Sequence, residues 1–262
     1  MKWCRFQAGN TASYGVVDNE RVVRVEGSPF ADYRLAGDSH ALSQVQLLPS
    51  VVPPTFYAVG FNYLEHVLHY QRLGSKTAKV PERAEVGYRA SNALIGHGES
   101  IVIPADFDGT LEAEGEIVAV IGRKVRRVAS RDEARAAIFG WTIGNDVSAR
   151  EWQRADRTFW RCKNSDTFKP MGPWIDTDTD IDQAHTRVYV NNQVSGDFKT
   201  NNMIFDTLHY IMEISRYITL YPGDVLWMGA ESTAVIKPGD TVSVEIAGIG
   251  TLSNPVVAEA TV

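Results

Sequence analysis

Short apolar runs of strand length, bounded by glycine and proline, recur along this chain and limit the folds it can form. Runs of four to eight such residues between turn signals are typical of buried strands. The clearest runs are residues 101–104, 116–122, 140–144, 187–190 and 224–228. Strands outnumber the expected helices and do not alternate with them as β–α–β units. The sequence therefore predicts an α+β fold, a mixed β-sandwich or roll.

Three segments have the pattern of helices. Residues 62–73 form the first, which carries His66 and His69 at a spacing that makes them neighbours on a helix. Residues 130–138 begin with a capping-box sequence, in which Ser130 is followed three residues later by Glu133. Residues 202–216 place apolar side chains along one stripe, which is typical of a helix packed on a core.

Tandem prolines divide the chain near residue 52. Pro53 and Pro54 cannot continue a helix or a central strand. Before them, residues 13–17 and 21–25 have the pattern of short strands joined by a turn. We therefore predict a small N-terminal β lobe over residues 1–52 and a larger domain over residues 53–262.

Charge and cysteine content restrict the partners and the compartment. The chain has 26 lysines and arginines and 32 aspartates and glutamates, which gives a net charge of −6. This charge disfavours nucleic acid and acidic membrane surfaces as partners and favours a small molecule. The two cysteines, Cys4 and Cys162, suggest neither a disulfide framework nor a cysteine metal cluster. The sequence shows no signal pattern and no apolar stretch of roughly 18 residues. We expect a cytoplasmic protein that does not enter a membrane.

A row of carboxylates precedes an apolar run in the middle of the chain. Glu112, Glu114 and Glu116 follow one another at a spacing of two, which in a strand directs them to one face. Asp146 follows another apolar run. Carboxylates on one face repel each other unless a cation neutralises them, so the pattern indicates a site for a hard divalent ion. The alternatives are a solvated edge strand for the glutamates and a helix N-cap for Asp146.

Several motifs, in one order, resemble the fumarylacetoacetate hydrolase superfamily from about Phe56 to the end of the chain. The motifs are Gly60-Phe61-Asn62-Tyr63-Leu64-Glu65-His66, Glu114-Gly115-Glu116 with its apolar run, Asn145-Asp146-Val147-Ser148-Ala149-Arg150, Lys163 before Asp166-Thr167-Phe168, Met203-Ile204-Phe205, and Lys237-Pro238-Gly239-Asp240 leading to Gly248-Ile249-Gly250-Thr251-Leu252. The resemblance implies that residues 53–262 form the catalytic domain of this family.

The resemblance also implies a metal centre. Members hold a divalent cation, usually Mg²⁺ or Mn²⁺, with a Glu-x-Glu pair and a later aspartate, which match Glu114, Glu116 and Asp146. Glu112 then falls outside the ligand set. Such a centre leaves positions for two oxygens of a 2-oxo acid or a 1,3-dicarbonyl, whose enolate it would stabilise.

Three further positions match family residues that act on the substrate. Lys163 matches a lysine beside the metal that supplies positive charge to a developing enolate or oxyanion. His66 matches a histidine on a lid that acts as a general base on the hydrolytic water. Gln153 matches a glutamine that often contacts substrate.

Other positions depart from the family pattern. Hydrolytic members commonly carry a glutamate three residues after the lid histidine, where this chain has His69. Either Glu65 takes the place of that glutamate or the activation of water is weak. Many members read Gly-Thr-Pro-Glu-Gly where this chain has Ala230 in place of the threonine, so Ser232 or Thr233 is the candidate for the missing substrate-binding hydroxyl. Arg89 stands in place of a common lysine and is a further candidate substrate contact.

The resemblance therefore implies a metal-dependent hydrolase or lyase that cleaves a carbon–carbon bond in a 2-oxo acid or β-dicarbonyl, such as an acylpyruvate. Decarboxylation, keto–enol isomerisation and hydration share the enolate step and stay open as alternatives. The departures at His69 and Ala230 also leave open a non-catalytic member that binds a metal or a ligand.

Members of the family are typically dimers or larger assemblies, and the apolar strands near the C-terminus offer faces that two copies can share. We therefore expect a homodimer. Light scattering should give about twice the chain mass of 29.0 kDa. A mass near that of one chain at every concentration would contradict the expectation.

Overall fold

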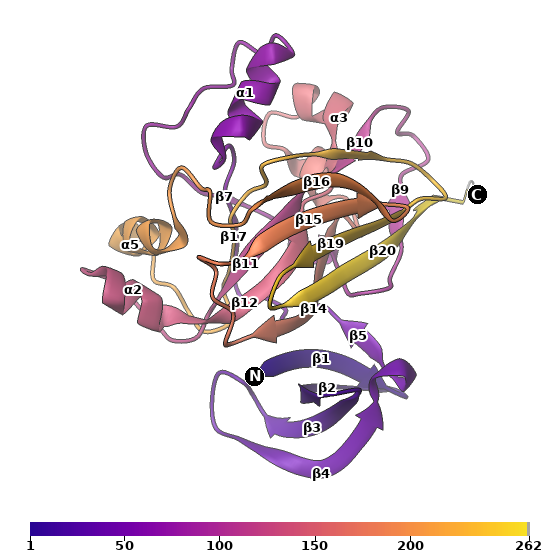
Figure 1. The fold of residues 1–262 in the computed structure, drawn as a ribbon, viewed down its shortest axis with the longest axis vertical. Coiled ribbons are helices and arrows are strands. Elements are labelled where there is room, and N and C mark those ends of the chain that lie inside the picture. The colour runs from indigo at the N-terminus through magenta and orange to yellow at the C-terminus, as the bar shows by residue number, and fades with distance from the viewer. Residues whose placement is uncertain (261–262) are drawn as a thin grey trace.

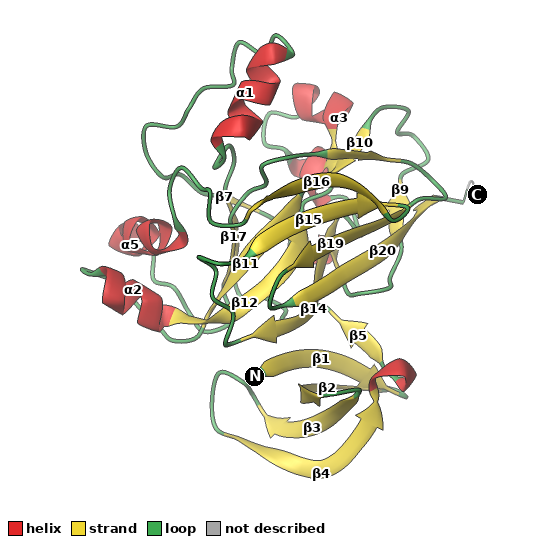
Figure 2. Ribbon diagram, viewed as in Figure 1, coloured by secondary structure: helices red, strands yellow, loops and turns green. Residues whose placement is uncertain are grey.

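The structure, a computed structural model, describes residues 1–260 and confirms the α+β class. Within these residues the strands form three sheets, and short helices lie around them (Figure 2). None of the helices in this range is long and apolar enough to cross a membrane.

The largest sheet has the strand order β4-β3-β2-β1-β14-β12-β11-β17-β6-β7, with β5 beside β1 and β8 beside β14. The bounds of its strands are β1 Lys2–Ala8, β2 Thr11–Asp18, β3 Arg21–Gly27, β4 Tyr33–Ala41, β5 Gln46–Leu48, β6 Phe56–Ala58, β7 Gly87–Tyr88, β8 Leu94–Ile95, β11 Gly115–Ile121, β12 Ile138–Asn145, β14 Lys169–Asp176 and β17 Val225–Trp227.

Two smaller sheets complete the fold. One has the order β16-β15-β19-β20-β9, and the other has the order β13-β10-β18. Their bounds are β9 Ile101–Ile103, β10 Leu111–Ala113, β13 Ser148–Ala149, β15 His185–Val190, β16 Gln193–Lys199, β18 Ala234–Ile236, β19 Thr241–Ile246 and β20 Gly250–Ala258. Each of the five runs predicted as strands overlaps a strand of the structure. These strands are β9, β11, β12, β15 and β17.

The N-terminal strands lie together as a group below the rest of the molecule in Figure 1. They belong to the large sheet, because β1 pairs with β14 through Lys2 opposite Asp176 and Trp3 opposite Ile175. The predicted strands at residues 13–17 and 21–25 lie in β2 and β3. The division of the chain at residue 52 stays a prediction.

The helices only partly follow the sequence prediction. Their bounds are α1 Leu64–Arg72, α2 Arg131–Ala137, α3 Arg150–Ala155, α4 Trp160–Asn164 and α5 Thr207–Tyr217, with 3-10 turns at Leu42–Gln44 and Ser91–Ala93. The capping box is present, since Ser130 Oγ accepts a hydrogen bond from the Glu133 N–H at 3.2 Å. The start predicted at residue 202 is wrong, because Asp206 caps the helix and the Phe205 N–H donates instead to Asn62 Oδ1 at 3.0 Å.

The strand β11 is the centre of the core. All of its residues are buried, and its side chains alternate between two apolar clusters on opposite faces of the sheet. At Gly115 the five-stranded sheet comes so close that an added Cβ would lie 2.7 Å from Val188 Cγ2 in β15 and 2.9 Å from Val244 Cγ1 in β19. Glycine at this position therefore allows the two sheets to pack at the strand that carries the glutamates.

Replacing Gly115 by alanine should lower the free energy of unfolding by about 1–3 kcal/mol, because the methyl group overpacks two β-branched side chains. Urea denaturation measures the change. Gly60→Ala is the matched control, since a Cβ there meets no atom within 4 Å. Equal stability of the wild type and Gly115→Ala would show that the sheets can separate at this point without cost.

Candidate active site

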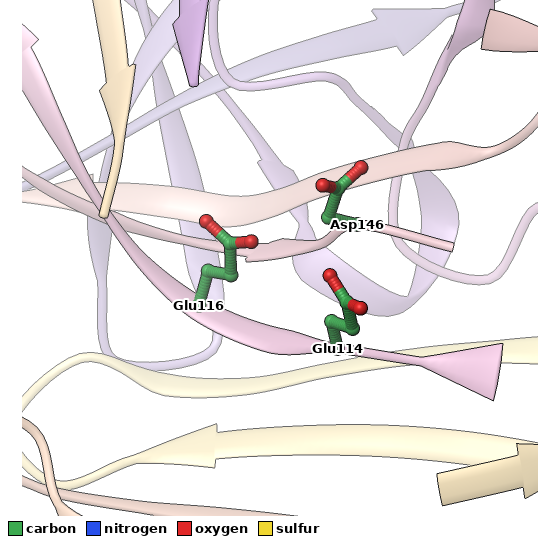
Figure 3. Close-up of side chains that lie close together, drawn as sticks. All are labelled: Glu114, Glu116 and Asp146. Atoms are coloured by element: carbon green, nitrogen blue, oxygen red, sulfur yellow. The ribbon is translucent and has the colours of Figure 1, made fainter. Parts of the chain in front are cut away.

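The three carboxylates predicted to hold a metal converge where β11 and β12 pair (Figure 3). Glu114 lies between β10 and β11, Glu116 lies in β11, and Asp146 follows β12 directly. The Asp146 N–H donates to the Glu114 carbonyl at 2.9 Å, which locks the two backbone segments together. Ligand oxygens of all three side chains lie within 4.8 Å of one another, and all three residues are buried.

Asp146 is surrounded by cations. Its Oδ2 lies 2.9 Å from both Lys163 Nζ and an Arg89 guanidinium nitrogen, and its Oδ1 lies 2.7 Å from Lys169 Nζ. Burial acts to raise the pKa of Asp146, but these three cations outweigh it and hold the pKa well below its usual range. Burial also lowers the pKa of Lys169 to about 8, so that its ammonium is still charged at pH 7.

Arg150, at the start of α3, organises the glutamate side of the site. Its guanidinium contacts Glu114 and lies 2.6 Å from Glu112 Oε2, and its NH1 donates to Gln153 Oε1 at 2.7 Å. Because the amide oxygen of Gln153 accepts from Arg150, its NH₂ group is available to another acceptor, and it has no hydrogen-bond partner among residues 1–260. Burial acts to raise the pKa of Glu114, but Lys163 and Arg150 outweigh it and hold the pKa at about 2.

Glu116 is the carboxylate that no side-chain cation contacts within the described residues. It accepts a hydrogen bond from the Gly229 N–H at 2.7 Å. Burial raises its pKa well above the usual range, and the neighbouring charges of Asp146 and Glu114 add to this effect. A divalent cation between the three side chains would offset both effects and let Glu116 ionise, and oxygen ligands are those that such a hard ion prefers. The donor set therefore fits Mg²⁺ or Mn²⁺.

A cavity of about 770 Å³ opens over the carboxylates. Its wall includes Glu114, Glu116 and Asp146 and also four of the other predicted residues, His66, Arg89, Gln153 and Lys163. Phe61, Tyr70, Leu73 and Phe159 add an apolar part. The structure thus brings these seven predicted residues to one cavity.

His66 projects from α1 and is buried in the cavity wall. Its ring packs 5.1 Å from the Tyr70 ring and 5.5 Å from the Phe61 ring. Burial lowers the pKa of His66 below 6.5, so the imidazole is neutral at pH 7. Within residues 1–260 no carboxylate hydrogen-bonds to it, and His69 on the same helix is exposed.

Lys163 reaches the site because Asp156 holds the start of its helix. Asp156 Oδ2 accepts hydrogen bonds from the Arg161 N–H at 3.1 Å and the Cys162 N–H at 2.8 Å. The buried Lys163 Nζ then lies 2.9 Å from both Glu114 Oε2 and Asp146 Oδ2. Its ammonium therefore bridges two of the three convergent carboxylates.

The structure does not bring Ser232 and Thr233 to the cavity. Gly229 and Ala230 line its wall, whereas Ser232 lies beside Gly196 of β16. Among the described residues, the buried Ser232 hydroxyl has no hydrogen-bond partner. A role for either hydroxyl in binding substrate stays a prediction that this geometry does not support.

Two cations of the site, Arg150 and Lys169, were not assigned a role from the sequence. Arg150 carried a signal, because it ends the motif that begins at Asn145 and Asp146. Lys169 follows the motif Asp166-Thr167-Phe168 by one residue but carried no periodic or spacing signal. Its part in the site depends on the pairing of β14 with β12, which the sequence does not show.

Comparison with known proteins identifies the family. Residues 55–257 match the family described as "Fumarylacetoacetate (FAA) hydrolase C-terminal". The chain belongs to the fumarylacetoacetate hydrolase family. The resemblance found in its motifs is thereby confirmed. Residues 1–49 match a second family, described as "Rv2993c-like, N-terminal".

Relatives in the fumarylacetoacetate hydrolase family cover most of the chain. Protein Rv2993c of Mycobacterium tuberculosis is 38% identical over 233 residues, which are 87% of this chain and 85% of the relative. Oxaloacetate tautomerase YisK of Bacillus subtilis is 31% identical over 231 residues, 83% and 75% of the two chains. The crystal structure of 5-carboxymethyl-2-hydroxymuconate delta-isomerase from Mycobacterium smegmatis has a TM-score of 0.88 and 36% identity, covering 99% and 100% of the two chains.

Adding Mn²⁺ to chelator-treated protein should stabilise it, because one cation relieves the repulsion among three carboxylates. At about a hundred times its Kd, a bound ion adds about 2.7 kcal/mol to the free energy of unfolding. Calorimetric titration should show one site in the wild type and none in Glu116→Gln. Glu112→Gln is the matched control and should keep the site, since Glu112 contacts Arg150. Full binding by Glu116→Gln would exclude this ligand set.

Proposed function

We propose that this protein is a keto–enol tautomerase of 2-oxo dicarboxylic acids of the oxaloacetate type, dependent on Mg²⁺ or Mn²⁺. The observation that carries the proposal is a neutral His66 that no carboxylate of residues 1–260 orients, in the wall of a cavity with three convergent carboxylates that fit a metal ion. Such a site is equipped to move a proton on an enolisable substrate. Its described residues do not form the carboxylate–histidine pair that the resemblance implies for hydrolytic members.

The charges of the site support a doubly charged substrate. The four buried or half-buried carboxylates are equal in number to four cationic side chains beside them, which include Arg150 at Glu112 and Lys169 at Asp146. A bound divalent ion, which lets Glu116 ionise, leaves two positive charges in excess. A dicarboxylate such as oxaloacetate neutralises both of them on binding.

The bound cation would supply positive charge to two substrate oxygens and so acidify the adjacent C–H group. The free NH₂ group of Gln153 is placed to donate to a substrate oxygen, and Lys163 supplies an ammonium beside the carboxylates. The neutral His66 ring takes the proton from C3 as the C2–C3 double bond forms. The same ring then returns that proton to the oxygen on C2, so that no net proton is gained or lost.

Relatives support this choice among the reactions of the family. The Bacillus subtilis protein is named an oxaloacetate tautomerase, and the Mycobacterium smegmatis protein an isomerase. Both reactions move a proton along an enolisable carbon skeleton without a hydrolytic water.

Carbon–carbon hydrolysis, the reaction first predicted from the motifs, is the second candidate. The observation that favours it is also His66, because a neutral imidazole in the cavity wall is able to take a proton from water. NMR of an acylpyruvate and of oxaloacetate, each with Mg²⁺ or Mn²⁺, separates the two candidates. Tautomerisation of oxaloacetate without cleavage of the acylpyruvate supports the proposal, and cleavage at a comparable rate overturns it.

Replacing His66 by alanine should slow enol–keto conversion of oxaloacetate by about 10²- to 10⁴-fold, the usual loss for a general acid–base group. The decay of enol absorbance measures the rate. Mn²⁺ affinity should be unchanged, because His66 is not among the three convergent ligands.

His69→Ala is the matched control for this measurement. It removes an exposed histidine from the same helix and should convert oxaloacetate at the wild-type rate. If His66→Ala were as active as this control, the proton would be carried by another group and the assignment of His66 would be wrong.

A further inference from the structure

Lys169 is a fully buried lysine behind the carboxylates, with 0% of its surface exposed. It is the first residue of β14 and does not line the cavity within the described part of the chain. Lysines are almost never fully buried unless they are paired, because an ammonium without partners is costly to remove from water. A lysine in this position therefore calls for a specific partner.

All three N–H groups of Lys169 have acceptors close to Asp146. Nζ donates to the Val147 carbonyl at 3.0 Å and to the Phe168 carbonyl at 2.8 Å, and it lies 2.7 Å from Asp146 Oδ1. An ammonium has three donors, so none is left over. Lys169 thus holds both the side chain of Asp146 and the backbone directly after it.

The two oxygens of Asp146 face different surroundings. Oδ2 lies against Lys163 and Arg89, both in the cavity wall. Oδ1 lies 2.7 Å from Lys169 in the interior and also accepts a longer hydrogen bond, of 3.3 Å, from Arg89 Nε. An ion that enters the cavity is able to displace the first two side chains from Oδ2. Lys169, which is fully buried and held by the Val147 and Phe168 carbonyls, keeps its contact with Oδ1.

We propose that Lys169 is a positioning residue that holds Asp146 by Oδ1 from behind, so that Oδ2 stays directed at the cavity as the metal ligand. The inference rests on the proposed metal centre but not on the reaction catalysed there. Without Lys169, Oδ1 would keep only the 3.3 Å hydrogen bond from Arg89 Nε among its described contacts. The carboxylate would then be free to turn with that arginine, and the ligand set would lose its preset geometry.

Calorimetric titration of chelator-treated protein with MnCl₂ tests the proposal. Lys169→Met approximately keeps the length of the side chain and removes its charge and donors. It should weaken Mn²⁺ binding about 10- to 100-fold, which is the usual effect of losing a group that orients a metal ligand. Lys169→Gln keeps a donor without the charge and should weaken binding less. If Lys169→Met does not fold, Lys169→Gln alone tests the proposal: weaker Mn²⁺ binding supports it, and wild-type binding overturns it.

Ile175→Val provides the control for a loss of stability alone. Ile175 is fully buried in the same strand as Lys169 and is not part of the site, so this variant should melt at a lower temperature with Mn²⁺ affinity unchanged. Wild-type or tighter affinity in a folded Lys169 variant would overturn the positioning role. Absence of Mn²⁺ binding by the wild type would instead overturn the metal centre itself.

Discussion

The burial of several carboxylates in one place is the constraint on which this structure depends. Glu114, Glu116 and Asp146 are almost completely removed from water, and like charges so close together oppose folding unless cations accompany them. The chain supplies those cations from separate elements: Arg150 begins α3, Lys163 belongs to α4, and Lys169 begins β14. Because these cations contact the carboxylates, the elements that carry them are held at the paired ends of β11 and β12. These contacts give the site its shape.

The register of strand pairing brings the carboxylates together. Gly115 pairs with Asn145, and this pairing places Glu114 beside Asp146. A shift by one residue would turn both glutamates to the opposite face of β11, where the apolar cluster that includes Ile117 and Ala119 packs. The packing of the five-stranded sheet against Gly115 opposes such a shift, because side chains at the neighbouring positions would then meet Val188 and Val244. The core and the candidate site are therefore held by the same contacts.

Within a family of shared fold, the reaction depends on a few side chains around the metal ligands. Here the deciding feature is the surroundings of His66, a buried ring between Tyr70 and Phe61 with a lowered pKa. A carboxylate beside it would raise that pKa and orient the ring toward water. The exposed His69 does neither, which supports the proposed proton transfer on the substrate over activation of water.

The sequence by itself determined the features that depend on local spacing: the α+β class, the capping box of α2, the family, and the three carboxylates that converge in the structure. These features depend on residues close together in the sequence, such as side chains that alternate along one strand or a motif within one segment. Only the tertiary structure decided that Lys169 stands behind Asp146, that Arg150 turns the amide of Gln153, that Ser232 lies away from the cavity, and that α5 starts at Thr207. These contacts join residues whose proximity follows from strand pairing and packing across the core, and spacing along the chain does not encode which distant segments will meet.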